Sequence, residues 1–200
     1  MVILQIVGAC VGWFILSCIV MSFVEHQVHS RLMHKTNYLS ARTATFKRIF
    51  EAHAIVHHKH YLKIFTDEPV PPGQDKEIRM NVHHGWIKGL PIAAIFGLVW
   101  WPASIIFLAT VTLHHWVWNK IHLEMHKPEH RGFSYWPAYK FLARHHCLHH
   151  KYPDKNFNVV FPCADYFLGT IVRATPADRL WVEEMLLPAA ATEKEFANVR

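Results

Sequence analysis

Two long apolar stretches divide an otherwise polar chain, and they give the first structural prediction. The first covers residues 2–24 and carries no charged side chain. About 20 consecutive apolar residues are needed for a helix to cross the hydrocarbon core of a bilayer. The stretch lacks the basic start and the small-residue cleavage site of a secretory signal peptide. We therefore expect residues 1–24 to form an N-terminal transmembrane helix.

The second stretch covers residues 89–119, which are 31 residues without a charge. As a single helix it would extend roughly 46 Å, which is too long for one crossing of a bilayer and short for two full crossings. Trp101 and Pro102 stand in its middle, and proline interrupts a helix because it lacks a backbone N–H. We expect a hairpin of two short transmembrane helices, about 89–100 and 103–119.

The remaining segments are polar. Residues 25–88 and 120–175 are rich in histidine, and residues 176–200 mix apolar and acidic side chains. Thr175 and Pro176 suit the start of a short helix in this last segment, because proline is favoured in the first turn. The pattern predicts an all-α integral membrane fold. One transmembrane helix and a short hairpin would lie under a cytoplasmic helical cap, all as one domain.

The charges and cysteines place the polar segments. The chain has 21 Lys and Arg against 15 acidic residues, and every Lys and Arg lies in 25–88 or 120–200. A nucleic-acid-binding protein would also be basic, but it would not contain two long apolar stretches. The bias fits the positive-inside rule and indicates a cytoplasmic cap, in a bacterial inner membrane or the endoplasmic reticulum. Four cysteines without a CxxC pair fit a reducing compartment.

Histidine is the exceptional component, with 18 residues against 15 acids. Four clusters flank the second apolar stretch, and within each the spacing of three to five residues brings imidazoles to a common side of a helix. A hairpin that runs out and back returns the chain to the side it left, so all the clusters can build one site. The ten candidate ligands are His29, His34, His53, His57, His58, His122, His126, His146, His149 and His150.

The composition of these clusters narrows the choice of metal. Ten imidazoles can supply two metals with five nitrogen ligands each and leave an open position on each ion. Ligation that is rich in imidazole and poor in carboxylate suits iron, zinc, copper or nickel. Two adjacent redox metals at a membrane surface are what O₂ activation on an apolar substrate requires, because side-chain acid–base chemistry does not break an unactivated C–H bond. We therefore expect iron, and the sequence leaves zinc open.

Two polar residues on the second apolar stretch share a helix face with the third cluster. His115, Asn119, His122 and His126 follow one another at intervals of four, three and four residues. On a helix this spacing places all four on one side. His115 would then lie about two turns deeper in the membrane than His122. We expect His115 and Asn119 to contact the ligands or a substrate cavity, or to lie at the membrane interface.

Further candidates lie beside the first and last clusters. His26 shares a helix with His29 and is either a hydrogen-bond partner of the site or an exposed residue. His145 is an alternative ligand to His146, although the H-x₂-H-H spacing favours His146. Asn156 and Asp165 can orient ligand imidazoles through hydrogen bonds, as carboxylates beside metal sites do, and Asp165 also suits a helix cap or turn.

The order of these motifs resembles a known family. The chain contains H-x₄-H, H-x₃-H-H, H-x₃-H and H-x₂-H-H in turn, with an apolar hairpin between the second and third. After the last cluster, Asn156 and the motif D-x₃-G-T at Asp165–Thr170 complete the pattern. This arrangement, over about residues 26–170, is similar to the fatty acid hydroxylase and sterol desaturase superfamily of integral-membrane di-iron enzymes.

The resemblance implies an activity and its partners. It implies a mono-oxygenase that uses O₂ to hydroxylate or desaturate a lipid hydrocarbon chain, such as a fatty acyl or sterol substrate. Electrons would come from a separate protein, a ferredoxin or a small cytochrome with its reductase, and no nucleic acid is involved. The alternative is a membrane protein that binds or transports metal without catalysis. A transporter would place ionisable groups in mid-membrane, whereas these clusters lie at one membrane edge.

One departure from the family pattern concerns the second cluster. Three residues, Ala54 to Val56, separate its first histidine from the H-H pair, where the family commonly has two. This spacing leaves open whether His53 is a ligand. His60, three residues after His57, is the alternative. The sequence does not distinguish hydroxylation from desaturation, and it does not identify the lipid.

Overall fold

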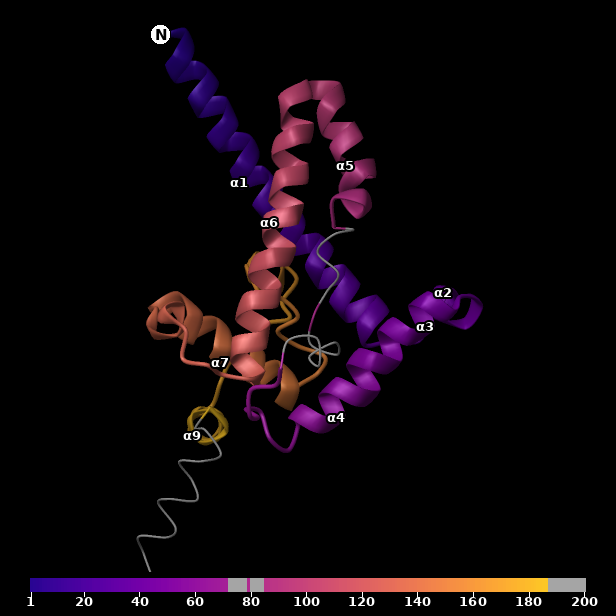
Figure 1. The fold of residues 1–200 in the computed structure, drawn as a ribbon, viewed down its shortest axis with the longest axis vertical. Helices are drawn as coiled ribbons and strands as arrows, with labels where there is room; N and C mark the ends of the chain where they lie inside the picture. Colours follow the sequence, from indigo (N-terminus) through magenta and orange to yellow (C-terminus); the bar gives the residue numbers. More distant parts are fainter. Residues whose placement is uncertain (72–78, 80–84, 187–200) are drawn as a thin grey trace, which may run out of the picture.

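A computed structural model describes residues 1–71, 79 and 85–186 of the chain. Within these residues the protein is built from helices and contains no strand, as the sequence predicted. Figure 1 shows the N-terminus and the turn between α5 and α6 at one end of the molecule, and α4, α7 and α9 at the other. The histidine-rich segments therefore gather away from the apolar ends of the helices.

The first helix, α1, covers Val2–Val28 and passes without a break into a π-helix, η1, at His29–Met33. Together they form a helix of 32 residues that is long and apolar enough to cross a membrane. Large apolar side chains near its start, including Ile3, Leu4 and Val7, are exposed. The helix itself continues past residue 24, because neither proline nor glycine follows Gly12 until Pro69 and nothing interrupts the helix there.

Helices α5 (Gly85–Val99) and α6 (Trp101–His126) form an antiparallel pair, shown side by side in Figure 1. The chain turns at Trp100, whose backbone is extended, so the break falls before Pro102 rather than at it. Pro102 lies in the first turn of α6, where its missing N–H has no helical partner to lose. The expected bounds of 89–100 and 103–119 were therefore too narrow, because both helices continue into the polar segments.

The two apolar parts of the fold pack on each other through one small core. Met21 of α1 is buried with Ala93 of α5 and with Phe107 and Val111 of α6. Gly89 is needed at this contact, because a Cβ atom there would lie only 3.1 Å from a methyl group of Val111. This close packing fixes α1 against the hairpin, and so it fixes the histidines that both elements carry.

A helical arm and a group of short helices complete the fold. The arm comprises α2 (Tyr38–Arg42), α3 (Ala44–Phe50), the π-helix η2 (Glu51–His57) and α4 (His58–Tyr61). The remaining elements are η4 (Gly132–Tyr135), α7 (Pro137–Lys151), α8 (Cys163–Phe167) and α9 (Pro176–Met185). Helix α9 begins where the sequence predicted, capped by the Thr175 side chain, and the tail 187–200 lies outside the described residues.

A second apolar core holds these short helices under the histidines. Trp118, Ile121 and Met125 of α6 pack there with Cys147 and Leu148 of α7. Phe65, Val159 and Val182 from three further segments join the same core. Because α6 contributes to both cores, it links the apolar end of the molecule to the histidine-rich end.

Candidate metal centre

The histidine clusters converge on two adjacent groups of side chains. In each group the candidate ligand atoms lie within 4.8 Å of one another. The first group is His29, His34, His53, His58 and His149. The second group is His57, His122, His126 and His146. These nine were all predicted, and the tenth, His150, lies at the edge of the second group with its Nε2 3.2 Å from Nε2 of His146.

Two π-helical turns explain how the first group forms. His29 and His34 are five residues apart, as are His53 and His58. The expectation that this spacing shares a face of an α-helix is wrong, because residues five apart point about 140° away from each other. In η1 the N–H of His34 bonds to the carbonyl of His29, and in η2 the N–H of His58 bonds to the carbonyl of His53. This i+5 hydrogen bond defines a π-helix and brings the two members of each pair to one side.

The extra residue in the second cluster is accommodated in this way. His53 has its Nε2 2.8 Å from Nε2 of His29 and 3.2 Å from Nε2 of His58. His57, the residue before His58, points instead to the second group. The alternative ligand, His60, lies outside both groups, half exposed and 3.2 Å from the carboxylate of Asp67. The sequence left open whether His53 or His60 is the candidate ligand, and the structure places His53, not His60, in the first group.

The two longer helices supply the other members with ordinary α-helical spacing. His122 and His126, four residues apart near the end of α6, both belong to the second group. On α7, His146 joins the second group while His149 joins the first. His150 lies between the groups, with its ring stacked on that of His58 at a centroid distance of 4.3 Å. Helix α7 therefore ties the two groups together.

Backbone carbonyls fix the orientation of three of these imidazoles. His149 donates a hydrogen bond from Nδ1 to the carbonyl of Lys155 at 2.6 Å, and His126 donates from Nδ1 to the carbonyl of Phe65 at 2.9 Å. His29 donates in the same way to the carbonyl of Phe157. Because Nδ1 carries the proton, Nε2 of each ring presents a lone pair toward its group.

The spacing of these lone pairs fits a metal ion. Nε2 of His34 lies 3.0 Å from Nε2 of His149, and Nε2 of His122 lies 3.0 Å from Nε2 of His146. Nitrogen ligands lie about 2.0–2.1 Å from zinc, and similarly bound ligands at right angles would stand about 3.0 Å apart. Among the described residues, neither ring nitrogen of the buried His57 has a hydrogen-bond partner. The residues therefore fit bound metal ions, to which one of these two nitrogens would be a ligand.

Burial keeps the imidazoles in the neutral form that a metal requires. His53, His126, His146 and His149 have pKa values well below the ordinary value of 6.5, first because burial disfavours the charged ring and then because neighbouring histidines repel it. Burial also lowers the pKa of His58 to about 3. Within the described residues neither group contains a carboxylate, so the donor set is imidazole alone.

The histidines predicted to flank the site have other partners. His145 donates from Nε2 to the carboxylate of Asp165 at 3.0 Å, which leaves His146 in the group. His26 bonds to the hydroxyl of Thr170 at 2.9 Å and lies 3.6 Å from Asp165. Burial opposes the charge of Asp165, but hydrogen bonds, first from His145, outweigh it and lower the pKa of this carboxyl below its ordinary value.

The Asp165 carboxylate supports the site through the backbone that follows Asn156. It accepts hydrogen bonds from the backbone N–H groups of Phe157 and Asn158 at 2.9 and 2.8 Å. The carbonyl of Phe157 in turn receives His29. Asn156 itself adopts φ of 52° and donates from its amide to the carbonyl of His145. Asp165 and Asn156 therefore orient His29 indirectly, through the backbone of Phe157 that lies between them and this imidazole.

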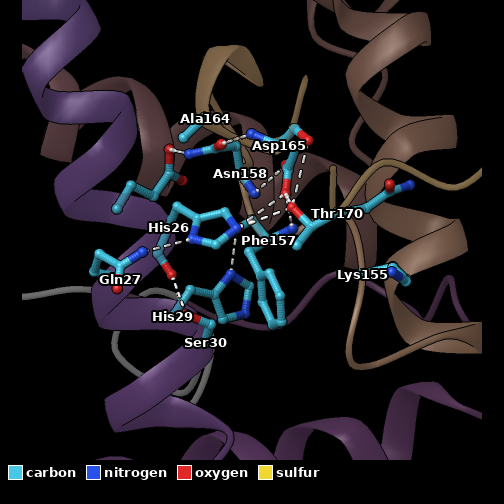
Figure 2. Close-up of polar contacts among 12 residues, drawn as sticks. His26, Gln27, His29, Ser30, Lys155, Phe157, Asn158, Ala164, Asp165 and Thr170 are labelled. Carbon is cyan, nitrogen blue, oxygen red and sulfur yellow. Dashed lines mark hydrogen bonds and ion pairs between the residues drawn. The ribbon is translucent and has the colours of Figure 1, made fainter. Parts of the chain in front are cut away.

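Figure 2 shows Asp165 among its partners Asn158, His26 and Thr170. Residues on α1 that the sequence did not single out complete this support. The buried Glu25 carboxylate accepts from the N–H of Val159 at 2.9 Å and from the amide of Asn158 at 3.1 Å. Ser22 donates to the carbonyl of Phe161 at 2.6 Å. The position of Glu25 at the end of an apolar helix could have marked it in the sequence as a functional candidate. Its partner Val159, however, lies more than 130 residues away in the sequence.

Of two further candidates, only His115 lies in the wall of a described cavity. His115 donates from Nδ1 to the carbonyl of Val111 at 2.9 Å, and Asn119 is half buried on the same helix. Neither belongs to a histidine group. Glu124, also on α6, accepts from Ser134 at 2.5 Å and pairs with Arg131. Burial raises the pKa of the Cys147 thiol, which fits a packing role.

An apolar cavity of about 240 Å³ lies between α1, α5 and α6. Met21, Ile92 and Phe107 line it on the side of the apolar core, and His29 of the first group lies in its wall. Trp118 is also part of the wall, and its ring packs on that of His122 at 4.1 Å. The cavity therefore reaches the first histidine group directly, and the Trp118 ring separates it from His122 of the second group.

Comparison with known proteins does not assign the chain to a family. No family model, curated protein or solved structure matches it. The statement that the residues themselves support is therefore a chemical one. The protein has an N-terminal helix able to cross a membrane and two buried groups of histidines able to hold metal ions.

Proposed function

We propose that the protein is a membrane-bound, O₂-dependent oxygenase that holds two iron ions and hydroxylates or desaturates a lipid hydrocarbon chain. The observation that carries this proposal is the apolar cavity, whose wall includes His29 and the Trp118 ring packed on His122. A structural metal site has no use for an apolar passage to its ligands. An oxygenase that acts on a hydrocarbon needs one.

The arrangement of the histidines supports two metals rather than one. The first group offers five imidazoles, and the second offers four with His150 beside them. The first group would hold one ion, and the second group together with His150 would hold the other. Imidazole ligands suit iron and also zinc, and iron is proposed because the reaction requires a redox metal. The resemblance of the motif order to the fatty acid hydroxylase and sterol desaturase superfamily agrees with this choice.

The reaction balances with an external electron donor. Hydroxylation converts one C–H bond and O₂, with two electrons and two protons, into an alcohol and water. Desaturation uses the same inputs to remove two hydrogens from the chain and gives two waters. A bound iron pair would supply the activation of O₂. The electrons come from a separate protein, and a ferredoxin or a small cytochrome with its reductase fits this role.

The described side chains contribute holding, orientation and exclusion of water. Buried imidazoles with protonated Nδ1 hold their Nε2 lone pairs in place, as in His149. Met21, Ile92 and Phe107 give the hydrocarbon chain an apolar wall. With His29 and His122 fully buried, bulk water is kept from the site of C–H cleavage. We place the helices α1, α5 and α6 across or into the membrane, with the histidine groups on the cytoplasmic side.

The decisive experiment combines metal analysis with a lipid product assay. The purified protein should contain about two irons per chain and form an oxygenated or unsaturated lipid only when O₂ and an electron donor are present. His149→Ala should abolish the product and lower the bound metal, because His149 belongs to the first group. His60→Ala is the matched control, since His60 lies outside both groups, and it should retain metal and product.

Two results would contradict the proposal in different ways. Full metal content without an O₂-dependent product, with every donor tried, would favour a metal-binding or transport protein. Activity that survives His149→Ala would show that the proposed ligands are wrong.

A further inference from the structure

The cavity is small and its wall is almost entirely apolar. Its volume of about 240 Å³ lies below the roughly 300–1,000 Å³ of sites for drug-sized ligands. Three helices enclose it, and the packing of Gly89 against Val111 leaves little room between α5 and α6. A single hydrocarbon chain fits such a passage better than a bulky ring system or two chains side by side.

The charged groups in the wall differ in whether they have partners. Both oxygens of Glu25 accept hydrogen bonds, from Val159 and Asn158, so this carboxylate is occupied by the fold itself. His114 lies 3.5 Å from the same carboxylate. Lys88 is exposed and, in the part of the chain that the structure describes, has no hydrogen bond or ion pair. It is the one Lys or Arg among the described residues that line the cavity.

We propose that this cavity takes a lipid with one hydrocarbon chain and a free anionic head group, and that Lys88 binds the head group. The inference rests on the proposed function and names its class of substrate. The head group stays at the exposed ammonium of Lys88, while the chain lies along Ile92 and Phe107 and passes His29. Carboxylate and phosphate monoester heads share the required charge, and the test separates them.

A comparison within the sequence argues that Lys88 has more than a flanking role. Lys88 and Lys120 bound the chargeless stretch 89–119 on its two sides. Both are exposed, and lysines at the ends of membrane helices commonly reach toward the interface. Only Lys88 of the two lines the cavity. Lys120 is therefore a matched control for the general effect of a lysine at the membrane edge.

The test measures lipid binding and needs neither metal nor turnover. A single-chain fatty acid brominated on its chain quenches tryptophan fluorescence on contact, and Trp118 lines the cavity. The purified full-length protein is titrated with this probe, and Trp118→Phe identifies the signal from the cavity among the eight tryptophans. Displacement by an unbrominated fatty acid, an alkyl phosphate and the alcohol of equal chain length then ranks the head groups.

The expected result is preference for the anions over the alcohol and dependence on one lysine. Lys88→Gln should weaken binding of the fatty acid about fivefold and leave the alcohol unchanged, as loss of one exposed ion pair predicts. Lys120→Gln should change neither. Added salt should weaken binding of the anions alone. The ratio between fatty acid and alkyl phosphate identifies which anionic head is preferred.

Several outcomes would overturn the inference. These are equal binding of alcohol and anions, equal effects of the two lysine substitutions, and quenching that Trp118→Phe does not reduce. The proposed function is judged separately, from metal content and product. Anion binding that depends on Lys88 in a protein without O₂-dependent product would leave this site standing and remove the oxygenase proposal. A product formed from neutral lipids, with affinity independent of Lys88, would support the oxygenase proposal and remove the proposed head-group site.

Discussion

At the scale of single residues, the candidate site depends on side chains that never touch a metal ligand. Asp165 is fully buried and accepts four hydrogen bonds, from two backbone N–H groups, from Thr170 and from His145. Its effect reaches the first histidine group through the backbone of Phe157, whose carbonyl receives His29. The position of that imidazole therefore depends on a carboxylate 136 residues further along the chain.

We predict that Asp165→Asn weakens metal binding and stability together. The new amide can place only one oxygen where the carboxylate placed two, so at least one donor, Phe157 N–H or Asn158 N–H, would face an NH₂ group. An unsatisfied buried donor costs about 1–3 kcal/mol. Loss of such an outer partner commonly lowers metal affinity by about 10- to 100-fold. Competition with a chelator and thermal unfolding measure the two effects.

The neighbouring Asp154 provides the control for this substitution. It lies in the loop between α7 and α8 and is exposed, so Asp154→Asn should leave both quantities unchanged. Equal metal affinity in the wild type and in Asp165→Asn would show that the loop does not orient His29.

At the scale of elements, the two π-helical turns determine which histidines can meet. In η2 one extra residue widens the turn, so that His53 and His58 face the first group while His57 faces the second. The preceding helix α3 has no fully buried residue, so a change in its rotation would disturb no fully buried side chain of its own. The arm can therefore tolerate a change of length that the rest of the site cannot.

We therefore predict that deleting one residue from η2 and inserting one residue into it have different effects on metal content. Deleting the exposed Ile55 leaves His53 and His58 four residues apart, on one face of an ordinary α-helix, and both metals should be retained. Inserting one alanine after Ile55 turns His53 about 100° further round, and one of the two metals should be lost. The metal content of each purified variant measures the outcome.

Ile55→Ala keeps the chain length and serves as the control, with metal content as in the wild type. Equal loss of metal from the deletion and the insertion would contradict the argument, because it would mean that the π-helical turn itself is required.

At the scale of the whole molecule, the apolar ends of the helices and the histidine groups lie on opposite sides. The N-terminus and the turn at Trp100 lie at one end, and the histidine groups lie toward the other (Figure 1). If α1 and the hairpin cross a membrane, the turn must be reached from the side opposite the histidines. The proposed topology follows from this arrangement and from the positions of the charges.

Labelling of single cysteines tests the topology. In a variant without the four native cysteines, Ser104→Cys beside the turn should react with a membrane-impermeant reagent from the side opposite the histidines. Asp154→Cys, exposed in the loop after α7, should react only from the other side. Labelling of both from the same side would exclude the proposed hairpin.

The sequence predicted those features that depend on local pattern. Apolar stretches gave the helices, and the spacing of histidines gave the candidates that the structure brings together. The π-helical turns were not predicted, because the sequence shows the extra residue between His53 and the H-H pair but not how the backbone accommodates it. The partners of His29 and Glu25 were not predicted either, since Phe157 and Asn158 reach them only through the tertiary fold.

Helix α6 has a mechanical consequence for the candidate site. Its 26 residues run without a break from the turn at Trp101 to His126, a rod of roughly 39 Å. Any tilt at its apolar end must move His122 and His126 at its other end. The other two members of the second group, His57 and His146, belong to η2 and α7, so a tilt of α6 changes the spacing within that group. In a bilayer, membrane thickness influences helix tilt, and lipid composition would therefore act on the geometry of the second proposed metal site.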